Sequence, residues 1–254
     1  MDLRYGRKNI DIDGVDIRIV ECKSALSDSN LEADYSLNPY RGCSHGCTYC
    51  YAPFVIKESE PWGSFVEVRR NIPRILSKEL RKKEKGIVRI GSVTDPYQEV
   101  EKHYELTRMC LEQLKRKGFP VIIQTKSDLV TRDIDLFDKM DVDIGLTITS
   151  LDNDFKNKFE NNAPDVKNRI KALKKLTNSN INTWVFIGPL LPYQNDDIEA
   201  LNKLVDKLHD IGIDEIYFDK LNMRKGMWKK LKEILDYGTT EKYRDIFFDD
   251  NNYF

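Results

Sequence analysis

From residue 34 onward, short apolar runs alternate with longer segments in which apolar residues recur every three or four positions. Runs of the first kind are typical of β-strands and segments of the second kind of amphipathic helices. Several runs are rich in Val and Ile, as strands buried on both faces are. Strands are predicted over residues 35–40, 87–92, 121–125, 143–149, 182–187 and 215–219. Because a helical segment follows each strand, we expect a parallel sheet with right-handed crossovers, either doubly wound or curved into a barrel of fewer than eight strands.

The two ends of the chain differ from this repeat. Residues 9–20 alternate apolar and charged positions on either side of Asp13-Gly14, a dipeptide typical of two-residue hairpin turns. The residues from Thr239 onward carry five aromatic side chains among acidic ones, and burial of aromatic surface favours packing of this tail over fraying. We therefore expect three parts: a β-hairpin extension (1–33), the α/β unit (34–238) and an aromatic and acidic tail (239–254).

The composition excludes several classes of protein. The 41 Lys and Arg residues balance 42 Asp and Glu residues, so no global charge would attract a polyanion. No apolar run is long enough to span a membrane, and none follows the charged start as in a secretion signal, so a cytoplasmic protein without membrane contact is expected. An odd number of cysteines, five, in such a chain favours metal binding or catalysis over a disulfide framework.

Three of these cysteines, Cys43, Cys47 and Cys50, form a C-x3-C-x2-C cluster directly after the first predicted strand. A structural zinc site needs a fourth ligand, which would have to be His45, Cys22 or Cys110. A 4Fe-4S cluster instead takes three cysteines on three irons and leaves the fourth iron open to an external ligand. The spacing therefore favours an iron–sulfur cluster, with zinc as the alternative.

The cluster motif, with Tyr49 just before its last cysteine, resembles the signature of the radical S-adenosylmethionine (SAM) superfamily. This resemblance implies a partial (β/α)6 barrel, a 4Fe-4S cluster, and reductive cleavage of SAM to a 5′-deoxyadenosyl radical. The segments NPYRGCSHGCTYCYAP, GSVTDPYQEVE and TKSDLVTRD look closest to the branch that contains spore photoproduct lyase, and NKFENNAPDVKNRI, IGPLLPYQND and FDKLNMR are later echoes. The resemblance covers residues 34–224 and implies an electron donor such as a ferredoxin or flavodoxin.

Polar residues follow each predicted strand, and the carboxyl ends of parallel strands meet at one edge of a sheet, where such folds build their active sites. By resemblance, Tyr49 would pack on the adenine of SAM and Tyr51 would take part in radical transfer. Thr94 and Asp95 could bind the ammonium group of SAM, although Asp95-Pro96 is also a common turn. Lys126 could pair with the SAM carboxylate. Thr147 and Thr149 could reach the ribose, although strand threonines are often only structural.

Spore photoproduct lyases carry a hydrogen-donating cysteine where this chain has Ser92, which leaves the hydrogen donor, and with it the exact reaction, open. The branch and a basic segment, residues 69–85, favour a nucleic-acid substrate, with Arg70, Arg74, Arg81 and Lys82 as phosphate contacts. A peptide or small-molecule substrate is the alternative within the superfamily. A zinc-binding module or a passive iron–sulfur electron carrier is the alternative outside it.

Overall fold

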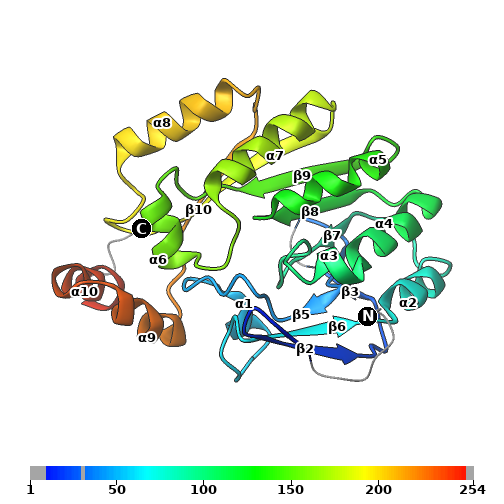
Figure 1. The fold of residues 1–254 in the computed structure, drawn as a ribbon, viewed down its shortest axis with the longest axis horizontal. Coiled ribbons are helices and arrows are strands. Elements are labelled where there is room, and N and C mark those ends of the chain that lie inside the picture. The colour runs from blue at the N-terminus through cyan, green and yellow to red at the C-terminus, as the bar shows by residue number, and fades with distance from the viewer. Residues whose placement is uncertain (1–9, 30–31, 250–254) are drawn as a thin grey trace.

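The computed structural model describes residues 10–29 and 32–249, and a seven-stranded sheet forms its centre (Figure 1). The strand order is β11-β10-β9-β8-β7-β4-β3. These strands are β3 (Leu26–Asp28), β4 (Tyr35–Leu37), β7 (Val88–Ile90), β8 (Val121–Thr125), β9 (Val142–Thr147), β10 (Asn182–Leu190) and β11 (Ile216–Lys220). Neighbours from β4 to β11 pair in parallel, and β3 pairs with β4 antiparallel.

This order decides between the two predicted architectures. The six parallel strands lie side by side in chain order without the reversal that a doubly wound sheet requires, so the sheet is the predicted partial barrel. In the described part of the chain, the edge strands β3 and β11 do not pair with each other. The barrel is therefore open along one side.

The helices that connect the strands lie along one side of the sheet, and further helical segments follow the last strand, β11 (Figure 1). The segments are α2 (Ile72–Glu79), α3 (Glu101–Tyr104), α4 (Leu106–Lys117), the 3-10 helix η2 (Asp128–Asp133), α5 (Ile134–Phe137), α6 (Asn153–Phe159), α7 (Val166–Asn178), α8 (Ile198–His209), α9 (Lys225–Ile234), α10 (Tyr237–Arg244) and the π-helix η3 (Asp245–Asp249). Their apolar stripes pack against alternate residues of the strands, including the fully buried Ile123, Ile144 and Leu146. Cys110 is part of this core, as predicted.

A second sheet of four strands has the order β1-β2-β6-β5. The predicted hairpin is confirmed as β1 (Ile10–Ile12) and β2 (Val15–Val20), but β2 also pairs in parallel with β6 (Phe65–Arg69), which the sequence did not predict. The strand predicted over residues 35–40 is divided: β4 ends at Leu37, and β5 (Tyr40–Arg41) belongs to this second sheet. Pro39 lies between them, and proline cannot donate a hydrogen bond to a strand ladder.

The described part of the C-terminal tail packs on the domain. Tyr243 in α10 is fully buried, and Phe247 in η3 contacts the same apolar cluster. Tyr253 and Phe254 lie outside the described residues, and the predicted division into three parts stays a prediction. Across the residues that the structure describes, no helix has the length and apolar character that crossing a bilayer requires.

Leu146 lies at the centre of this fold, fully buried on β9. We expect Leu146→Ala to lower the free energy of unfolding by about 2 to 5 kcal/mol, because the substitution leaves a cavity in the core. Ile198→Ala is the matched control: this side chain is 67% exposed, and the expected change is within about 0.5 kcal/mol. Urea unfolding measures both. Equal losses in the two variants would contradict the assigned core.

Candidate active site

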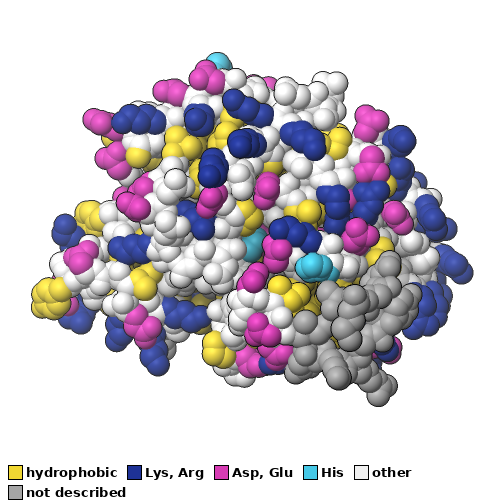
Figure 2. All heavy atoms as spheres, viewed as in Figure 1, with side chains coloured by type: hydrophobic (Ala, Val, Ile, Leu, Met, Phe, Trp, Pro, Cys, Tyr) yellow, Lys and Arg dark blue, Asp and Glu magenta, His cyan; other side chains and the backbone are white. Residues whose placement is uncertain are grey.

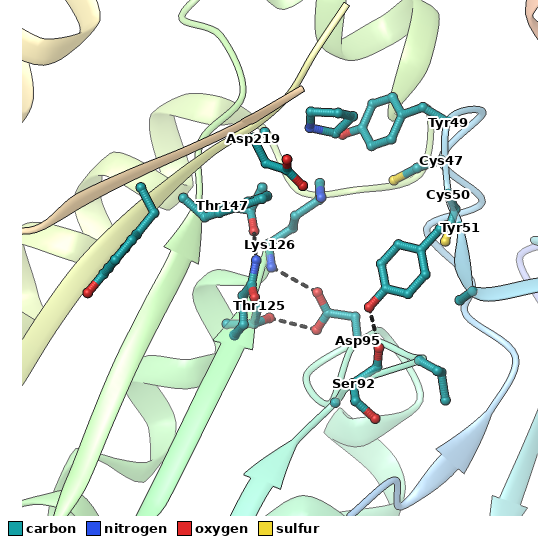
Figure 3. Close-up of a pocket in the computed structure, with 18 of the residues that line it drawn as sticks. Cys47, Tyr49, Cys50, Tyr51, Ser92, Asp95, Thr125, Lys126, Thr147 and Asp219 are labelled. Atoms are coloured by element: carbon teal, nitrogen blue, oxygen red, sulfur yellow. Dashed lines mark hydrogen bonds between the residues drawn. The ribbon is translucent and has the colours of Figure 1, made fainter. Parts of the chain in front are cut away.

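A cavity of about 870 Å³ extends from the carboxyl ends of the parallel strands down the inner face of the sheet. Residues that follow β5, β7, β8 and β11 line it, among them Cys43, Asp95, Lys126 and Asn222, together with Thr147 and Pro189 near the ends of β9 and β10. Figure 3 shows the cysteine loop on one side of this space and the strand ends on the other. The predicted convergence of polar strand ends on one site is therefore confirmed.

The cysteine loop lies between β5 and the short helix α1 (Ala52–Val55), and Cys43, Cys47 and Cys50 all line the cavity as free thiols. The loop begins at Gly42, whose φ is +83°. A Cβ atom at this position would lie 2.4 Å from the carbonyl oxygen of Phe65. Only glycine therefore lets the chain turn from β5 into the loop so close to β6.

Gln98, which is fully buried, attaches this loop to the segment after β7. Its Oε1 accepts a hydrogen bond from the Ser44 backbone N–H at 2.8 Å, and its Nε2 donates to the Gly42 carbonyl at 3.2 Å and to Thr94 Oγ1 at 2.9 Å. The Thr94 hydroxyl in turn donates to the Gly42 carbonyl at 2.5 Å. Thr94 also lines the cavity, but its hydroxyl proton is already donated to the cysteine loop. Sequence reasoning missed Gln98, although it lies in the quoted GSVTDPYQEVE segment.

The Asp95 carboxylate is surrounded by donors. One oxygen accepts from Thr125 Oγ1 at 2.6 Å and from the Tyr97 backbone N–H at 2.9 Å, and the other accepts from the Lys126 backbone N–H at 2.8 Å (Figure 3). His45 Nδ1 lies 3.4 Å from this second oxygen. Burial lowers the pKa of His45 even though the charge of Asp95 opposes this. Asp95 thus connects the loop, β7 and β8.

A second buried carboxylate, Glu160, follows α6 and gathers residues from four segments. It accepts hydrogen bonds from the hydroxyls of Tyr49 and, at 2.8 Å, Thr149, and it forms an ion pair with Arg169 at 2.6 Å. Lys126 Nζ lies 3.9 Å from its Oε1 and 5.5 Å from the centre of the Tyr49 ring. Burial by itself would raise the pKa of Glu160, but the charges of Arg169 and Lys126 outweigh it and lower the pKa to about 2.

Glu160 and Arg169 were not predicted as site residues. Both lie in the segment NKFENNAPDVKNRI, which the sequence analysis had already singled out. In a chain with so many charged residues, however, one Glu and one Arg do not by themselves indicate a site. Thr149, expected near the ribose, is fully buried and bonded to Glu160, whereas Thr147 lines the cavity and accepts from Gln124 Nε2 at 3.2 Å.

Tyr51 also lines the cavity, is 47% exposed, and donates its hydroxyl to the Ser92 carbonyl at 2.5 Å (Figure 3). The Ser92 hydroxyl faces away from this contact, within hydrogen-bond distance of Ser36 Oγ (2.5 Å) and Asn38 Nδ2 (3.0 Å). Tyr51 and Ser92 therefore lie next to each other at the wall of the site.

The donor chemistry of the cysteine loop fits an iron–sulfur cluster better than a single metal ion. Burial raises the pKa of Cys47 to about 12 and also raises that of Cys43 and Cys50, so these thiolates need a positively charged metal centre beside them. Within residues 10–29 and 32–249, no three Cys, His, Asp or Glu side chains converge where one ion could bind. A cubane does not require such convergence, because each cysteine binds a different iron.

The Glu160 pKa predicts a pH dependence of stability. A folded-state pKa of about 2, below the ordinary value of 4.5, means that Glu160 stabilises the fold above pH 4.5 and that this contribution is lost as the pH falls toward 2. In urea unfolding of the metal-free protein, the wild type should lose about 3 kcal/mol more than Glu160→Gln across this window. Glu199→Gln, an exposed residue of α8, is the control and should follow the wild type. If the free energy of unfolding falls with pH equally in the wild type and in Glu160→Gln, the lowered pKa of Glu160 is wrong.

Comparison with known proteins agrees with this site. Residues 37–205 match the family model of the radical SAM superfamily. An uncharacterized protein of Methanocaldococcus jannaschii is 33% identical over 241 residues, which cover 91% of this chain and 87% of that protein. An uncharacterized protein of Acidianus two-tailed virus is 31% identical over 227 residues, which cover 80% of this chain and 74% of that protein.

Among solved structures, spore photoproduct lyase complexed with dinucleoside spore photoproduct superposes with a TM-score of 0.68 at 15% identity, over 91% of this chain and 79% of the lyase. A variant of the same lyase with bound S-adenosylmethionine and dinucleoside gives the same values. At this identity the likeness shows the fold. The family implies an iron–sulfur cluster and SAM as cofactors. The chain thus belongs to the radical SAM superfamily and is a radical SAM enzyme with the fold of spore photoproduct lyase.

Proposed function

We propose that the protein holds a 4Fe-4S cluster on Cys43, Cys47 and Cys50 and cleaves SAM reductively to methionine and a 5′-deoxyadenosyl radical, which abstracts a hydrogen atom from a substrate in the same cavity. The observation that carries this proposal is that the three cysteines and the ends of the parallel strands face one space of about 870 Å³. This volume is near the upper end of the range for small-molecule sites. The electron comes from an external donor such as a ferredoxin or flavodoxin.

Lys126 and Thr147 are the proposed direct contacts to SAM. Both line the cavity beside the cysteine loop, and the Lys126 ammonium is only partly neutralised, since Glu160 lies 3.9 Å away. The Thr147 hydroxyl only accepts, from Gln124, and keeps its proton for a ligand. The hydroxyls of Tyr49, Thr94 and Thr149, which are further predicted SAM contacts, already donate to the protein, and Asp95 already accepts three hydrogen bonds. We assign these four to the wall of the SAM site, where they hold the loop and the strand ends in place.

Tyr51 is the proposed group for radical transfer between substrate and cofactor. Its half-exposed ring reaches the cavity, and its hydroxyl is close to the Ser92 backbone, next to the position at which spore photoproduct lyases carry their donor thiol. A serine hydroxyl is a far poorer hydrogen-atom donor than a thiol. The reaction therefore differs from that of spore photoproduct lyase in its hydrogen-donating step.

A nucleic-acid fragment is the proposed substrate, on the likeness to a fold that binds a dinucleoside photoproduct. The helix α2 and the residues directly after it offer a surface for phosphates, with the exposed side chains Arg74, Lys78, Arg81 and Lys82. Within the described residues these four form no ion pair, because the acid of the same helix, Glu79, points inward and accepts from the Ala25 and Leu26 backbone N–H groups. Figure 2 shows Lys and Arg side chains gathered along the edge of the molecule where α2 and α4 lie.

Two features of this basic surface differ from the prediction. Arg70 is paired with Glu21 at 2.6 Å, so it is not free for a phosphate. The helix is also shorter than the basic segment: α2 ends at Glu79, and Arg81 and Lys82 lie beyond it. The shallow groove of about 320 Å³ between α2 and α4 is lined by Arg74, Lys78 and Arg81 together with Pro73, Ser77 and Gln113.

Cluster assembly and SAM cleavage test the proposed chemistry. Protein reconstituted without oxygen should be brown and contain about four irons per chain, and after reduction it should convert SAM to 5′-deoxyadenosine and methionine. Alanine at Cys43, Cys47 or Cys50 should abolish iron binding, whereas Cys22→Ala should retain it. Iron analysis and chromatography of the nucleoside measure the two effects. One zinc per chain and a colourless protein would overturn the proposal.

The salt dependence of binding tests the substrate class. Each phosphate contact to a single strand contributes about −0.7 to the slope of log affinity against log salt concentration. Replacing the three exposed cations Arg74, Arg81 and Lys82 by Gln should therefore make the slope for labelled single-stranded DNA or RNA less steep by about 2. The matched control replaces three exposed lysines of α7, Lys171, Lys174 and Lys175. Absence of binding at low salt would shift the substrate to a peptide or small molecule.

A further inference from the structure

The half of the cavity away from the cysteine loop has an unusual lining. Arg89 on β7, Ile122 on β8 and Asp143 on β9 stand in one register row, and Gln124 and Trp184 stand in the next row on either side of Gly145. All of these except Gly145 line the cavity. Closed α/β barrels fill this interior with branched apolar side chains. The polar and aromatic lining here therefore indicates a ligand compartment instead of a packed core.

Trp184 forms a flat wall of this compartment. A Cβ atom at Gly145 would lie 2.3 Å from the Trp184 indole, so the ring rests directly on the backbone of β9. Tyr217 on β11 stands against it edge-on, with ring centres 5.4 Å apart and an angle of 87° between the ring planes. Phe186, on the same strand as Trp184, also faces the cavity. Such a wall binds planar rings by stacking.

The hydrogen-bonding groups beside this wall are mostly acceptors. One Asp143 oxygen accepts from Asn182 Nδ2 at 2.5 Å, and its second oxygen has no partner among the described residues. Glu215 accepts from the Tyr217 hydroxyl at 3.3 Å. Glu32, Asp143 and Glu215 all line the cavity, so three carboxylates lie at this end. The charge of Glu215 and its hydrogen bond are the main causes that raise the pKa of Tyr217.

The side-chain amide of Gln124, which could donate to or accept from a ligand, is already bonded at both its oxygen and its nitrogen. Gln124 Oε1 accepts from Arg89 Nη2 at 2.6 Å, and Gln124 Nε2 donates to Thr147 Oγ1 at 3.2 Å. Arg89 and Asp143 form no ion pair within the described residues. The groups left for a ligand are therefore carboxylate oxygens, which only accept, and the remaining N–H groups of Arg89, which only donate.

We propose that this compartment binds a nucleobase that carries an exocyclic amino group, stacked on Trp184 with the amino group donating to Asp143. The inference rests on the proposed nucleic-acid substrate. Cytosine, adenine and guanine present an amino donor beside an acceptor, which matches the Asp143 and Arg89 pair. Thymine has no amino group: it carries a carbonyl oxygen at the 4-position, which a carboxylate repels, and its one donor is the ring N–H between two carbonyls.

Two matched ligand pairs test the proposal on reconstituted enzyme with SAM bound. The dinucleotides d(CpC) and d(UpU) differ only in the group at the pyrimidine 4-position and the ring proton that goes with it, and d(ApA) and its hypoxanthine analogue differ likewise. We expect the amino member of at least one pair to bind about tenfold tighter or more, measured by titration calorimetry. Equal affinity, or tighter binding of the oxo member, in both pairs would overturn the inference.

Variants then test whether Asp143 is the source of the preference for the amino group. Asp143→Asn keeps the acceptor for Asn182 but can donate to a carbonyl, so it should remove or reverse the preference, with SAM cleavage and the melting temperature as checks on folding. Trp184→Leu should weaken both members of a pair by the same factor. Glu199→Gln, on the exposed side of α8, should change neither. An unchanged preference in Asp143→Asn contradicts the assignment to that residue.

The result also distinguishes this inference from the proposed function. Failure of every dinucleotide to bind, with 5′-deoxyadenosine still formed, would overturn the nucleobase compartment and the nucleic-acid substrate but leave the radical SAM chemistry intact. Failure of SAM cleavage itself would overturn the proposed function. Binding of both members of each pair with equal affinity would overturn the inference, which is defined by the amino group, but would leave the nucleic-acid substrate standing.

Discussion

Parallel pairing of strands in chain order is the constraint on which the rest of this structure depends. Each of the six parallel strands of the large sheet must run in the same direction as its neighbour. Each connection between them therefore returns through a helix to the opposite edge of the sheet. Every carboxyl end then lies at one edge, and residues separated by more than a hundred positions, such as Cys43 and Asn222, face the same cavity. The active site is a direct consequence of strand direction.

Buried carboxylates hold the cysteine loop of that site against the sheet. Asp95 connects His45 of the loop to the backbone after β8, and Glu160 connects Tyr49 to Arg169 and Lys126. A buried charge is stable only where donors and opposite charges surround it, so these carboxylates fix the positions of their partners. The loop that carries the proposed cluster is therefore oriented by electrostatics as well as by packing.

The open side of the barrel has a different consequence. Because β3 and β11 do not pair among the described residues, the inner face of the sheet is wider than in a closed barrel and its centre is not filled by apolar side chains. Trp184 and Tyr217 on the last two strands, and Arg89 and Asp143 on earlier ones, can face a ligand there. Cofactor chemistry at the strand ends and substrate recognition below them therefore share one space.

The sequence by itself determined the six parallel strands, the hairpin at Asp13-Gly14 and the cysteine spacing, because periodicity, turn chemistry and ligand spacing are local properties. It could not determine that β6 joins the hairpin in parallel or that β5 separates from β4, since strand partners are chosen by contacts between distant segments. Gln98, Glu160 and Arg169 were missed for the same reason: a polar residue is recognised as part of a site only when its buried partners are known. Tertiary structure also decided that the sheet stays open, because closure depends on whether its first and last strands meet, and no local pattern encodes that distance.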